Sequence, residues 1–559
     1  MKRFNALNNI FGWVAFIVAA ITYLLTMEPT ASFWDCGEFI SAAYKLDVGH
    51  PPGAPFFMLT ARIFTLFASD PTKVAVMVNS LSALCSAFSI LFLFWTITHL
   101  GRKVVIKSDT DYSTANTIAI LGAGMVGALA YTFSDSFWFS AVEGEVYAYS
   151  SFFTAIVFWL ILKWERVADR SGSDRWLILI AYLMGLSIGV HLLNLLAIPA
   201  LVLVYYFKNY KPSAKGVVAA MGTAGVILVA VLYGLIPGFV EVASWFELFF
   251  VNTLGFAYNI GLYFYIVLTL AILIWGIYES YANKNTTRLA ISFVMAISIV
   301  GIPFIGGKVF VGIIIIAVMS FLMYWKKSKL NARWMNTALL MVTVLLIGYS
   351  SYSVIVIRSA AKPTMDQNSP DNLFALKYYL NRTQYGDRPL LYGSVYNAPV
   401  KLNVEGERCV PAVDKGEPTY EPKPKSSPTE KDEYIIVEYN SRNIMDERFD
   451  MFFPRMYYTP GIPETHIQGY KSWGNVTGTP VTFDYCGQQR TEMKPTFGEN
   501  LRYFFNYQVS FMYWRYFMWN FSGRQNDIQG YGEIDSGNWI TGIGFIDNIL
   551  VGDQTKLPS

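Results

Sequence analysis

The chain has 559 residues, of which 53% are hydrophobic and only 15% are charged, whereas a soluble domain is about a quarter charged. Its net charge of +3 is near neutral, so no basic surface for nucleic acid is indicated. Its four cysteines are too few for a disulfide scaffold, and none stands in a Cys-x-x-Cys pair. This composition predicts a membrane protein that has the lipid bilayer, and no nucleic acid, as a partner.

Eleven apolar runs are candidates to cross a bilayer, which takes about 18 to 25 residues. The neighbours 176–190 and 192–207 are two short crossings, and Gly189, His191 and Asn194 mark the bend between them. The run 54–68 is too short to span and is expected to lie in the interface or to re-enter. The first run is too long for a cleaved signal peptide. The eleven runs are residues 10–27, 74–99, 115–133, 147–163, 176–190, 192–207, 216–236, 261–280, 288–304, 308–325 and 335–357.

Lysine and arginine alternate between the loops as the positive-inside rule requires. The loops at 28–73, 134–146, around 191, 237–260 and 305–307 are poor in both residues. Eleven crossings therefore place residues 358–559 outside the membrane. The basic residues of the inner side are Lys2, Arg3, Arg102, Lys103, Lys107, Lys163, Arg166, Arg170, Arg175, Lys208, Lys211, Lys215, Lys284, Arg288, Lys326, Lys327, Lys329 and Arg333.

The predicted fold class is an α-helical polytopic membrane protein with a C-terminal α+β extracytoplasmic domain. The membrane domain covers residues 1–357, and its first external loop is 28–73. Residues 358–559 are rich in Pro, Gly, Asn, Asp and Tyr and contain no long apolar run. Cys409 and Cys486 lie in this part and either pair in an oxidising compartment or stay free.

The aromatic segment 500–521 is the most unusual stretch of the C-terminal part. It is the core of that domain, a helix at the membrane interface, where Trp and Tyr concentrate, or a sugar-binding surface. Trp514 and Trp519 are five residues apart, so on a helix they are offset by about 140°. We therefore expect one of them to be buried and the other to be available.

The strongest candidate for chemistry lies at residues 34–53, immediately after the first apolar run. Asp35, Glu38 and His50 are proton-transfer groups, and the Gly and Pro residues beside them can fix a tight, irregular backbone. The simpler alternative is a solvated loop whose charges keep it out of the bilayer.

Further polar residues lie on the predicted outer side. Glu143 and Glu145 belong to loop 134–146, while His191 and Asn194 belong to the bend after 190. Ionisable residues at membrane depth are costly and often functional, although a carboxylate at a helix end can simply cap the helix. His191 is expected either to make a structural hydrogen bond or to contact substrate.

A family resemblance rests on Asp35-Cys-Gly-Glu38 and His50-Pro-Pro-Gly53 after a hydrophobic first helix. This order resembles the hallmark of a family of membrane proteins abundant in the Bacteroides group. That family is similar to the vertebrate transmembrane O-mannosyltransferase of plexin-type receptors and, more distantly, to the GT-C glycosyltransferases. The resemblance covers residues 10–260, and residues 512–530 resemble the bacterial branch alone, whose members are often longer.

The resemblance implies transfer of a mannose-like sugar from a polyprenyl-phosphate donor to Ser/Thr hydroxyls of a secreted or envelope protein. It implies a bacterial inner membrane, a periplasmic C-terminal domain, and catalytic roles for Asp35 as the base and for Glu38. The substrate-binding candidates are His50, Lys45, Arg62, Glu143, Glu145, His191 and Asn194; of these, His50, Lys45 and Arg62 can stabilise the leaving phosphate. No cofactor or metal is expected, and nucleotide-binding phosphate loops are absent from the sequence.

Two other functions fit the same features. A transporter or flippase for a lipid-linked glycan should have paired broken helices with polar groups near the membrane midplane. The chain shows one broken pair, and its acids lie in outer loops, which favours an enzyme. A non-catalytic membrane subunit of an envelope assembly would tolerate the loss of Asp35.

Overall fold

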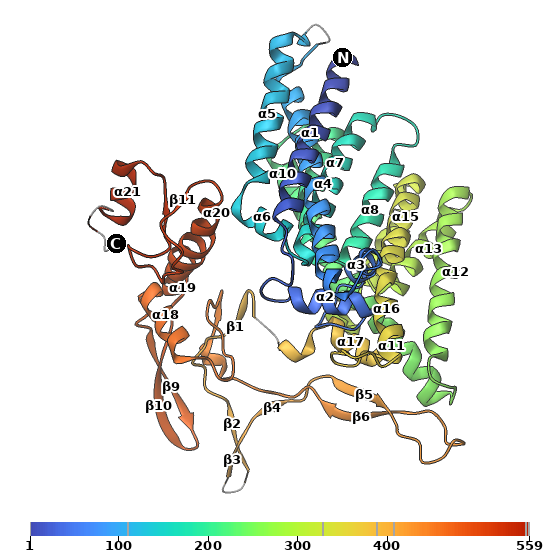
Figure 1. The fold of residues 1–559 in the computed structure, drawn as a ribbon. Coiled ribbons are helices and arrows are strands. Elements are labelled where there is room, and N and C mark those ends of the chain that lie inside the picture. The colour runs from blue at the N-terminus through green and yellow to red at the C-terminus, as the bar shows by residue number, and fades with distance from the viewer. Residues whose placement is uncertain are drawn as a thin grey trace. The chain divides into compact units, whose positions relative to one another are not determined.

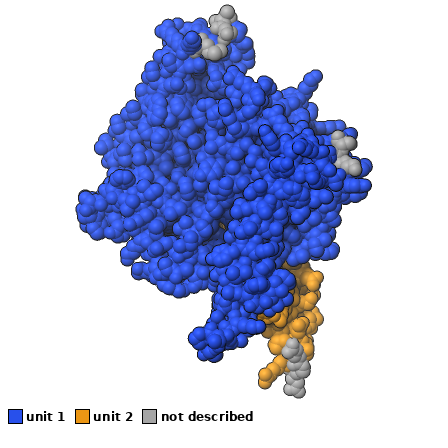
Figure 2. Space-filling view, turned by 90° about the vertical axis from the view of Figure 1, so that its right-hand side faces the viewer, with its two compact units in different colours: residues 1–384, 421–435 blue, residues 385–420, 436–559 orange. Residues whose placement is uncertain are grey.

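The computed structural model describes residues 2–108, 111–326, 329–386, 389–405, 408–553 and 556. Lys327, one of the basic residues of the predicted inner side, lies outside them. The chain forms two compact units, which Figure 2 distinguishes by colour. Unit 1 contains residues 1–384 and 421–435, and unit 2 contains residues 385–420 and 436–559.

Unit 1 is a bundle of helices (Figure 1). The short helices α2, α16 and α17 gather at the end of the bundle opposite the N-terminus. Its helices are α1 (Lys2–Thr26), α2 (Cys36–Lys45), α3 (Pro55–Thr65), α4 (Val74–Val105), α5 (Thr114–Thr132), α6 (Asp135–Ala141), α7 (Val146–Val167), α8 (Asp174–Ile188), α9 (Ile198–Asn209), α10 (Ala214–Val229), α11 (Ile236–Leu248), α12 (Ile260–Ala282), α13 (Thr286–Ile299), α14 (Val309–Trp325), α15 (Ala332–Tyr349), α16 (Ser353–Ala360) and α17 (Leu373–Leu380).

Eight helical stretches among the described residues are long and apolar enough to cross a membrane. The chain is therefore a multi-pass membrane protein, but the predicted number of eleven crossings is not confirmed. Runs 176–190, 288–304 and 308–325 form the helices α8, α13 and α14, which have 15, 14 and 17 residues. Glycines end two of these helices before their apolar runs end: Gly189 follows α8, and Gly301, which has positive φ, lies just after α13.

The expected loop 237–260 is largely helical. Residues 214–253 form one 40-residue helical stretch through α10, two π-helical turns and α11. The acids of this segment have structural roles. Glu247 accepts hydrogen bonds from the backbone N–H groups of Asn259 and Leu262 at the start of α12. Glu241 forms an ion pair of 2.7 Å with Lys377. A carboxylate at a helix start satisfies N–H groups that the helix itself leaves free.

Close helix approach explains why the short α8 belongs to the bundle. α8 and α15 cross at Gly185 and Gly348, where a Cβ on Gly185 would lie 2.4 Å from the carbonyl oxygen of Leu345. Small residues let helix backbones meet in this way. On the other side of the bundle α4 packs against α1, α5 and α7, around an apolar core that includes Phe94 and Ile90.

Unit 2 is an α+β structure of short elements, as predicted. Its described strands pair in two-stranded sheets, and a disulfide joins Cys409 on β3 to Cys486 in the turn between β9 and β10. The strands are β1 (Tyr392–Ser394), β2 (Leu402–Glu405), β3 (Arg408–Pro411), β4 (Val413–Asp414), β5 (Pro418–Pro422), β6 (Tyr434–Tyr439), β7 (Arg442–Asn443), β8 (Asp450–Phe452), β9 (Thr479–Tyr485), β10 (Gln488–Lys494), β11 (Gly523–Arg524) and β12 (Trp539–Ile540). Residues 421–422 of β5 and 434–435 of β6 belong to unit 1. The helices are α18 (Glu464–Gly474), α19 (Phe497–Tyr503), α20 (Arg515–Trp519) and α21 (Gly544–Val551), with a π-helix over Phe504–Trp514.

Candidate active site

Helix α2 positions the two motif carboxylates. Asp35 is its N-cap residue, but the exposed Asp35 carboxylate makes no capping hydrogen bond to the helix. Glu38 follows one turn later and is partly buried. The helix ends at Leu46, which has a left-handed backbone conformation, and Arg358 donates to the carbonyl oxygens of Leu46 and Lys45.

Glu38 holds His50 by two hydrogen bonds. The backbone N–H of His50 donates to Oε1 of Glu38 over 2.7 Å, and Nδ1 of the imidazole lies 2.9 Å from the same oxygen. Gly49 makes this possible, because a Cβ there would lie 2.5 Å from that oxygen. Burial raises the pKa of Glu38, but the hydrogen bonds from His50 outweigh it and lower the pKa overall. The hydrogen bond to Glu38 raises the pKa of His50 against the effect of burial.

Asp35, Glu38 and His50 form one cluster, with one ligand-type atom from each within 4.8 Å of the others. Two carboxylates and an imidazole are donor types that bind divalent cations, so these three residues could hold a metal ion. Glu38 Oε1 already accepts two hydrogen bonds from His50, so a cation bound through that oxygen would compete with the imidazole for it. The same three groups can instead accept, hold and donate protons.

Glu143 and Glu145 lie close to this cluster, since Glu145 interacts electrostatically with Asp35 and His50. They are buried in the turn between α6 and α7, where Gly144 packs against the side chain of Asn79. Burial raises the pKa of Glu145 to about 7, and repulsion from Asp35 and Glu143 adds to the shift. Burial also raises the pKa of Glu143. Glu145 is therefore close to half-protonated at neutral pH.

Distant segments of the chain complete the site. The backbone of Val48 pairs with residues 365–367 in a parallel bridge, which brings Gln367 into hydrogen-bonding contact with Glu38. The hydroxyl of Tyr379 donates to the carbonyl oxygen of Gly49 over 2.6 Å. Gln367, Tyr379 and Arg358 could not be predicted as part of the site from the sequence, because no local pattern connects residues that are more than 300 positions apart.

Two aromatic residues before Asp35 were also missed. Phe33 is 75% exposed and Trp34 is 90% exposed. Trp34 has a φ of 60°, a conformation that is strained for a bulky side chain and is often found at functional sites. The signal in the sequence was the pair of aromatic residues directly beside the motif aspartate.

The structure places Lys45 and Arg62 away from Asp35. Lys45 ends α2 while Asp35 precedes it, a separation of about 15 Å along the helix axis. The guanidinium of Arg62 donates to the carbonyl oxygen of Tyr44 over 2.6 Å, so it too lies at the far end of α2. Both cations are thus outside the cluster that Asp35, Glu38 and His50 form.

His191 and Asn194 lie in the bend between α8 and the next helical stretch. Nδ1 of His191 accepts the backbone N–H of Leu193 over 3.1 Å, and its ring lies 5.5 Å from that of Tyr147. Burial, together with repulsion from Arg382, lowers the pKa of His191, so it is neutral at pH 7. Asn194 is fully buried and donates to the hydroxyl of Ser187, which ties the bend to α8.

These features define a multi-pass helical membrane protein with a cluster of carboxylates and an imidazole at one end of its bundle. Residues 35–214 are similar to a family described as the N-terminal domain of protein O-mannosyl-transferase TMEM260. This matched range begins at Asp35 and includes every candidate site residue named from the sequence. Residues 386–505 match a family of unknown function.

Two curated proteins show the same similarity. The protein O-mannosyl-transferase tmem260 of Dictyostelium discoideum is 28% identical over 185 residues, which cover 32% of this chain and 20% of the relative. Protein O-mannosyl-transferase TMEM260 of Mus musculus is 29% identical over 174 residues, which cover 31% of this chain and 22% of the relative. The match spans about a fifth of the length of each of these relatives.

Proposed function

We propose that the chain is a membrane glycosyltransferase of the GT-C type that transfers a mannose-like sugar from a polyprenyl-phosphate donor to Ser/Thr hydroxyls of protein. The observation that carries this proposal is the cluster of Asp35, Glu38 and His50 within the range similar to the N-terminal domain of an O-mannosyl-transferase. The proposed setting is a bacterial inner membrane with the cluster on its periplasmic face.

Asp35 is the base of the proposed reaction. Its carboxylate is exposed and is not used to cap α2, so an acceptor hydroxyl can approach it. The hydroxyl oxygen attacks C1 of the sugar as its proton passes to Asp35. The bond between C1 and the phosphate oxygen breaks, and the phosphate leaves with the electron pair. One bond forms at C1 as another breaks, so the configuration of that carbon inverts.

The neighbouring groups support this step in different ways. Glu38 orients His50 through the hydrogen bonds to its backbone and its ring. Because this contact raises the pKa of His50, the imidazole carries more positive charge and can stabilise the leaving phosphate. Lys45 and Arg62 lie at the other end of α2 and are assigned no direct part. The exposed Phe33 and Trp34 suit contact with the apolar chain of a lipid donor.

A transfer assay with purified full chain tests this proposal. The donor is polyprenyl-phosphate mannose and the acceptor is a Ser/Thr-rich peptide. We expect Asp35→Asn to lower kcat at least about a hundredfold, because the nearly isosteric amide cannot accept the proton. Glu38→Gln should lose less, since it acts through His50.

Asp70→Asn is the matched control. Asp70 is an exposed acid of the same predicted external segment and caps a short helical turn through Thr72, a role that asparagine can also fill. Its variant should keep native activity and native thermal stability. Full activity of a correctly folded Asp35→Asn would remove the base assignment, and absence of transfer by the native protein would favour the transporter or the non-catalytic subunit.

A further inference from the structure

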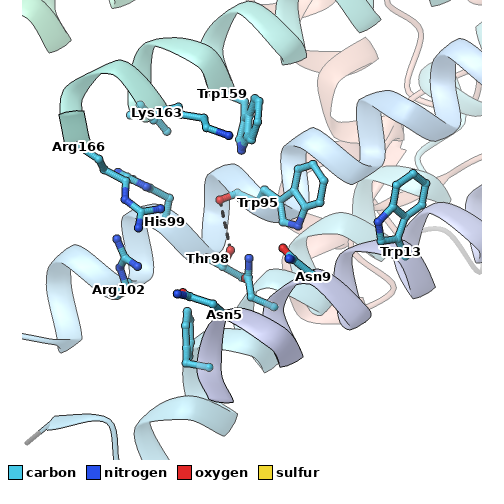
Figure 3. A pocket seen from close by; sticks show the side chains of 13 residues that line it. Asn5, Asn9, Trp13, Trp95, Thr98, His99, Arg102, Trp159, Lys163 and Arg166 are labelled. Atoms are coloured by element: carbon cyan, nitrogen blue, oxygen red, sulfur yellow. Dashed lines mark hydrogen bonds between the residues drawn. The ribbon is translucent and has the colours of Figure 1, made fainter. Parts of the chain in front are cut away.

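A cavity lies between helices α1, α4 and α7, at the ends of these helices that are far from the Asp35 cluster. It has a volume of about 430 Å³, within the usual range for small-ligand sites. The N-terminal half of α1 and the C-terminal parts of α4 and α7 form its walls, as Figure 3 shows. Glu145 precedes α7 and Arg166 stands near its end, so about 32 Å of helix separates the two sites. This is close to the thickness of a bilayer core.

Three cations face this cavity. Arg102, Lys163 and Arg166 line it, and no carboxylate is among its lining residues. Figure 3 shows Arg102 and Arg166 near each other and beside His99, and the two arginines repel each other. Within the described part of the chain neither guanidinium has a hydrogen bond or ion pair to a protein group. The nearby Glu165 does not line the cavity; it is paired with Lys103 and lies 3.6 Å from Nε2 of His99, a lining residue.

The polar and aromatic residues repeat along one face of each helix. On α4, Trp95 is followed by His99 and Arg102, four and seven positions later; on α7, Trp159 is followed by Lys163 and Arg166 at the same spacing. Positions that are four and seven apart share a helix face. Each helix thus presents an aromatic ring toward the middle of the bundle and a cation toward its end.

α1 completes the wall with amide groups. Asn5, Asn9 and Trp13 follow at spacings of four and line the cavity. Gly12 lets α1 approach the indole of Trp95, since a Cβ there would lie 2.5 Å from Nε1 of Trp95. This indole N–H is buried and has no acceptor among the described residues. A buried donor without a partner destabilises the fold, so the cavity offers both unpaired guanidinium groups and an unpaired hydrogen-bond donor.

We propose that this cavity binds the phosphate group of an anionic lipid in the membrane leaflet opposite the Asp35 cluster. The two arginines contact the phosphate oxygens, for which a guanidinium provides paired donors. Asn5 and Asn9 contact ester or glycerol oxygens, and the lipid chain leaves along α1 past Trp13. The exposed apolar side chains of Ile10, Val14 and Ile17 continue that path.

A lipid fits this site better than a soluble phosphate. Figure 3 shows Arg102, Arg166 and His99 at one end of the cavity and Trp13 at the other. The lining therefore changes from charged side chains at one end to an apolar side chain at the other. Tryptophan concentrates at the level of lipid headgroups, and α1, α4 and α7 are all candidate membrane spans. The proposal does not depend on the glycosyltransferase function.

Binding to purified full chain in detergent tests the proposal by native mass spectrometry. The probes are short-chain phosphatidic acid, the matching phosphatidylcholine, inorganic phosphate and glycerol 3-phosphate. We expect phosphatidic acid to bind at least about tenfold more tightly than the other three. Arg102→Gln/Arg166→Gln should weaken its binding at least about tenfold, whereas Arg102→Lys/Arg166→Lys should recover part of the loss.

The matched control is Arg170→Gln/Arg175→Gln. It removes the same charge from the turn after α7 and the start of α8 but leaves the cavity lining intact, and it should change binding less than about twofold. Equal losses in both double variants would overturn the proposal in favour of diffuse charge attraction. Equal binding of glycerol 3-phosphate and phosphatidic acid would overturn the lipid assignment. If the first double variant is thermally unstable, Asn5→Leu/Asn9→Leu replaces it, and unchanged binding there would also overturn the proposal.

Discussion

His50 touches Glu38 with two nitrogen atoms, and both contacts end on the same carboxylate oxygen. The backbone N–H is 2.7 Å and Nδ1 is 2.9 Å from Oε1 of Glu38. With the proton of neutral His50 on Nδ1, this contact leaves Nε2 as the acceptor; with His50 charged, both nitrogens donate. The pair thus fixes the orientation of the imidazole beside Asp35. Its contribution to the stability of the fold should depend on pH.

The Glu38–His50 pair should stabilise the fold most between about pH 4.5 and pH 6.5. Folding raises the pKa of His50 above its ordinary 6.5. The contribution of protonated His50 to the unfolding free energy is therefore complete below pH 6.5 and is lost as pH rises through the folded-state pKa. Folding lowers the pKa of Glu38 below 4.5. The contribution of ionised Glu38 to the unfolding free energy is therefore present above pH 4.5 and is lost as pH falls through the folded-state pKa. The Tm difference between native protein and Glu38→Gln should therefore be largest in this window, and a difference that is constant from pH 4 to pH 9 would contradict it.

Gly49→Ala should destabilise the protein by about 1 to 3 kcal/mol. The new Cβ would lie 2.5 Å from Oε1 of Glu38, so the carboxylate must leave its contact with His50. Gly37→Ala is the control, because its Cβ would lie 4.0 Å from that of Ala31 and the position is helical. Thermal unfolding of both variants checks the prediction, which fails if the two behave alike.

Glu145→Gln should be more stable than the native protein above pH 7. Burial raises the pKa of Glu145 from 4.5 to about 7, so the folded state binds this proton more tightly than the unfolded state does. Native stability then falls as pH rises from about 4.5 to 7, by up to about 3 kcal/mol. The glutamine variant lacks this loss. Its gain in Tm should grow over that interval and vanish at pH 4.5; a gain of the same size at both ends would rule out ionisation as the cause.

The two tryptophans of the aromatic segment should differ in their contribution to unit 2. As predicted, one is buried: Trp519 is 8% exposed and Trp514 is 45% exposed. The guanidinium carbons of Arg515 and Arg524 lie 4.8 and 4.2 Å from the Trp519 ring. We expect Trp519→Ala to lower the unfolding free energy by about 3 kcal/mol or more, and Trp514→Ala by less than about 1 kcal/mol. Chemical unfolding measures the loss of unfolding free energy in both variants. Equal losses would show that the whole segment belongs to the hydrophobic core of unit 2.

The orientation of the membrane domain can be tested by labelling with a membrane-impermeant thiol reagent in spheroplasts. Ser69→Cys, on the predicted outer side, should be labelled, whereas Ser171→Cys, on the predicted inner side, should not. Both positions are exposed. The native cysteines give little background, because Cys36 and Cys85 are buried and Cys409 is bonded to Cys486. Labelling of position 171 alone would show that the predicted topology is inverted and that the Asp35 cluster lies on the inner side.

The sequence by itself predicted the membrane bundle, the α+β C-terminal part and the importance of residues 34–53. These properties follow from local composition: long apolar runs need a bilayer, and a polar segment rich in Gly and Pro ends them. It did not predict the number of long spans, because helices α8 and α13 end before their apolar runs end, at Gly189 and just before Gly301, which takes positive φ. It also missed the helical course of residues 237–253, whose acids bind distant backbone and lysine groups.

Only the tertiary structure decided which polar residues meet. Lys45 is closer to Asp35 in sequence than His50 is, yet α2 carries it about 15 Å away. Gln367 and Tyr379 are far away in sequence, yet a backbone bridge at Val48 and a hydrogen bond to Gly49 bring them to the site. The pKa of Glu145 depends on burial, which the packing of α2, α4 and α7 creates. Composition and periodicity specify individual helices, whereas the neighbours of each charged group are set by how those helices pack.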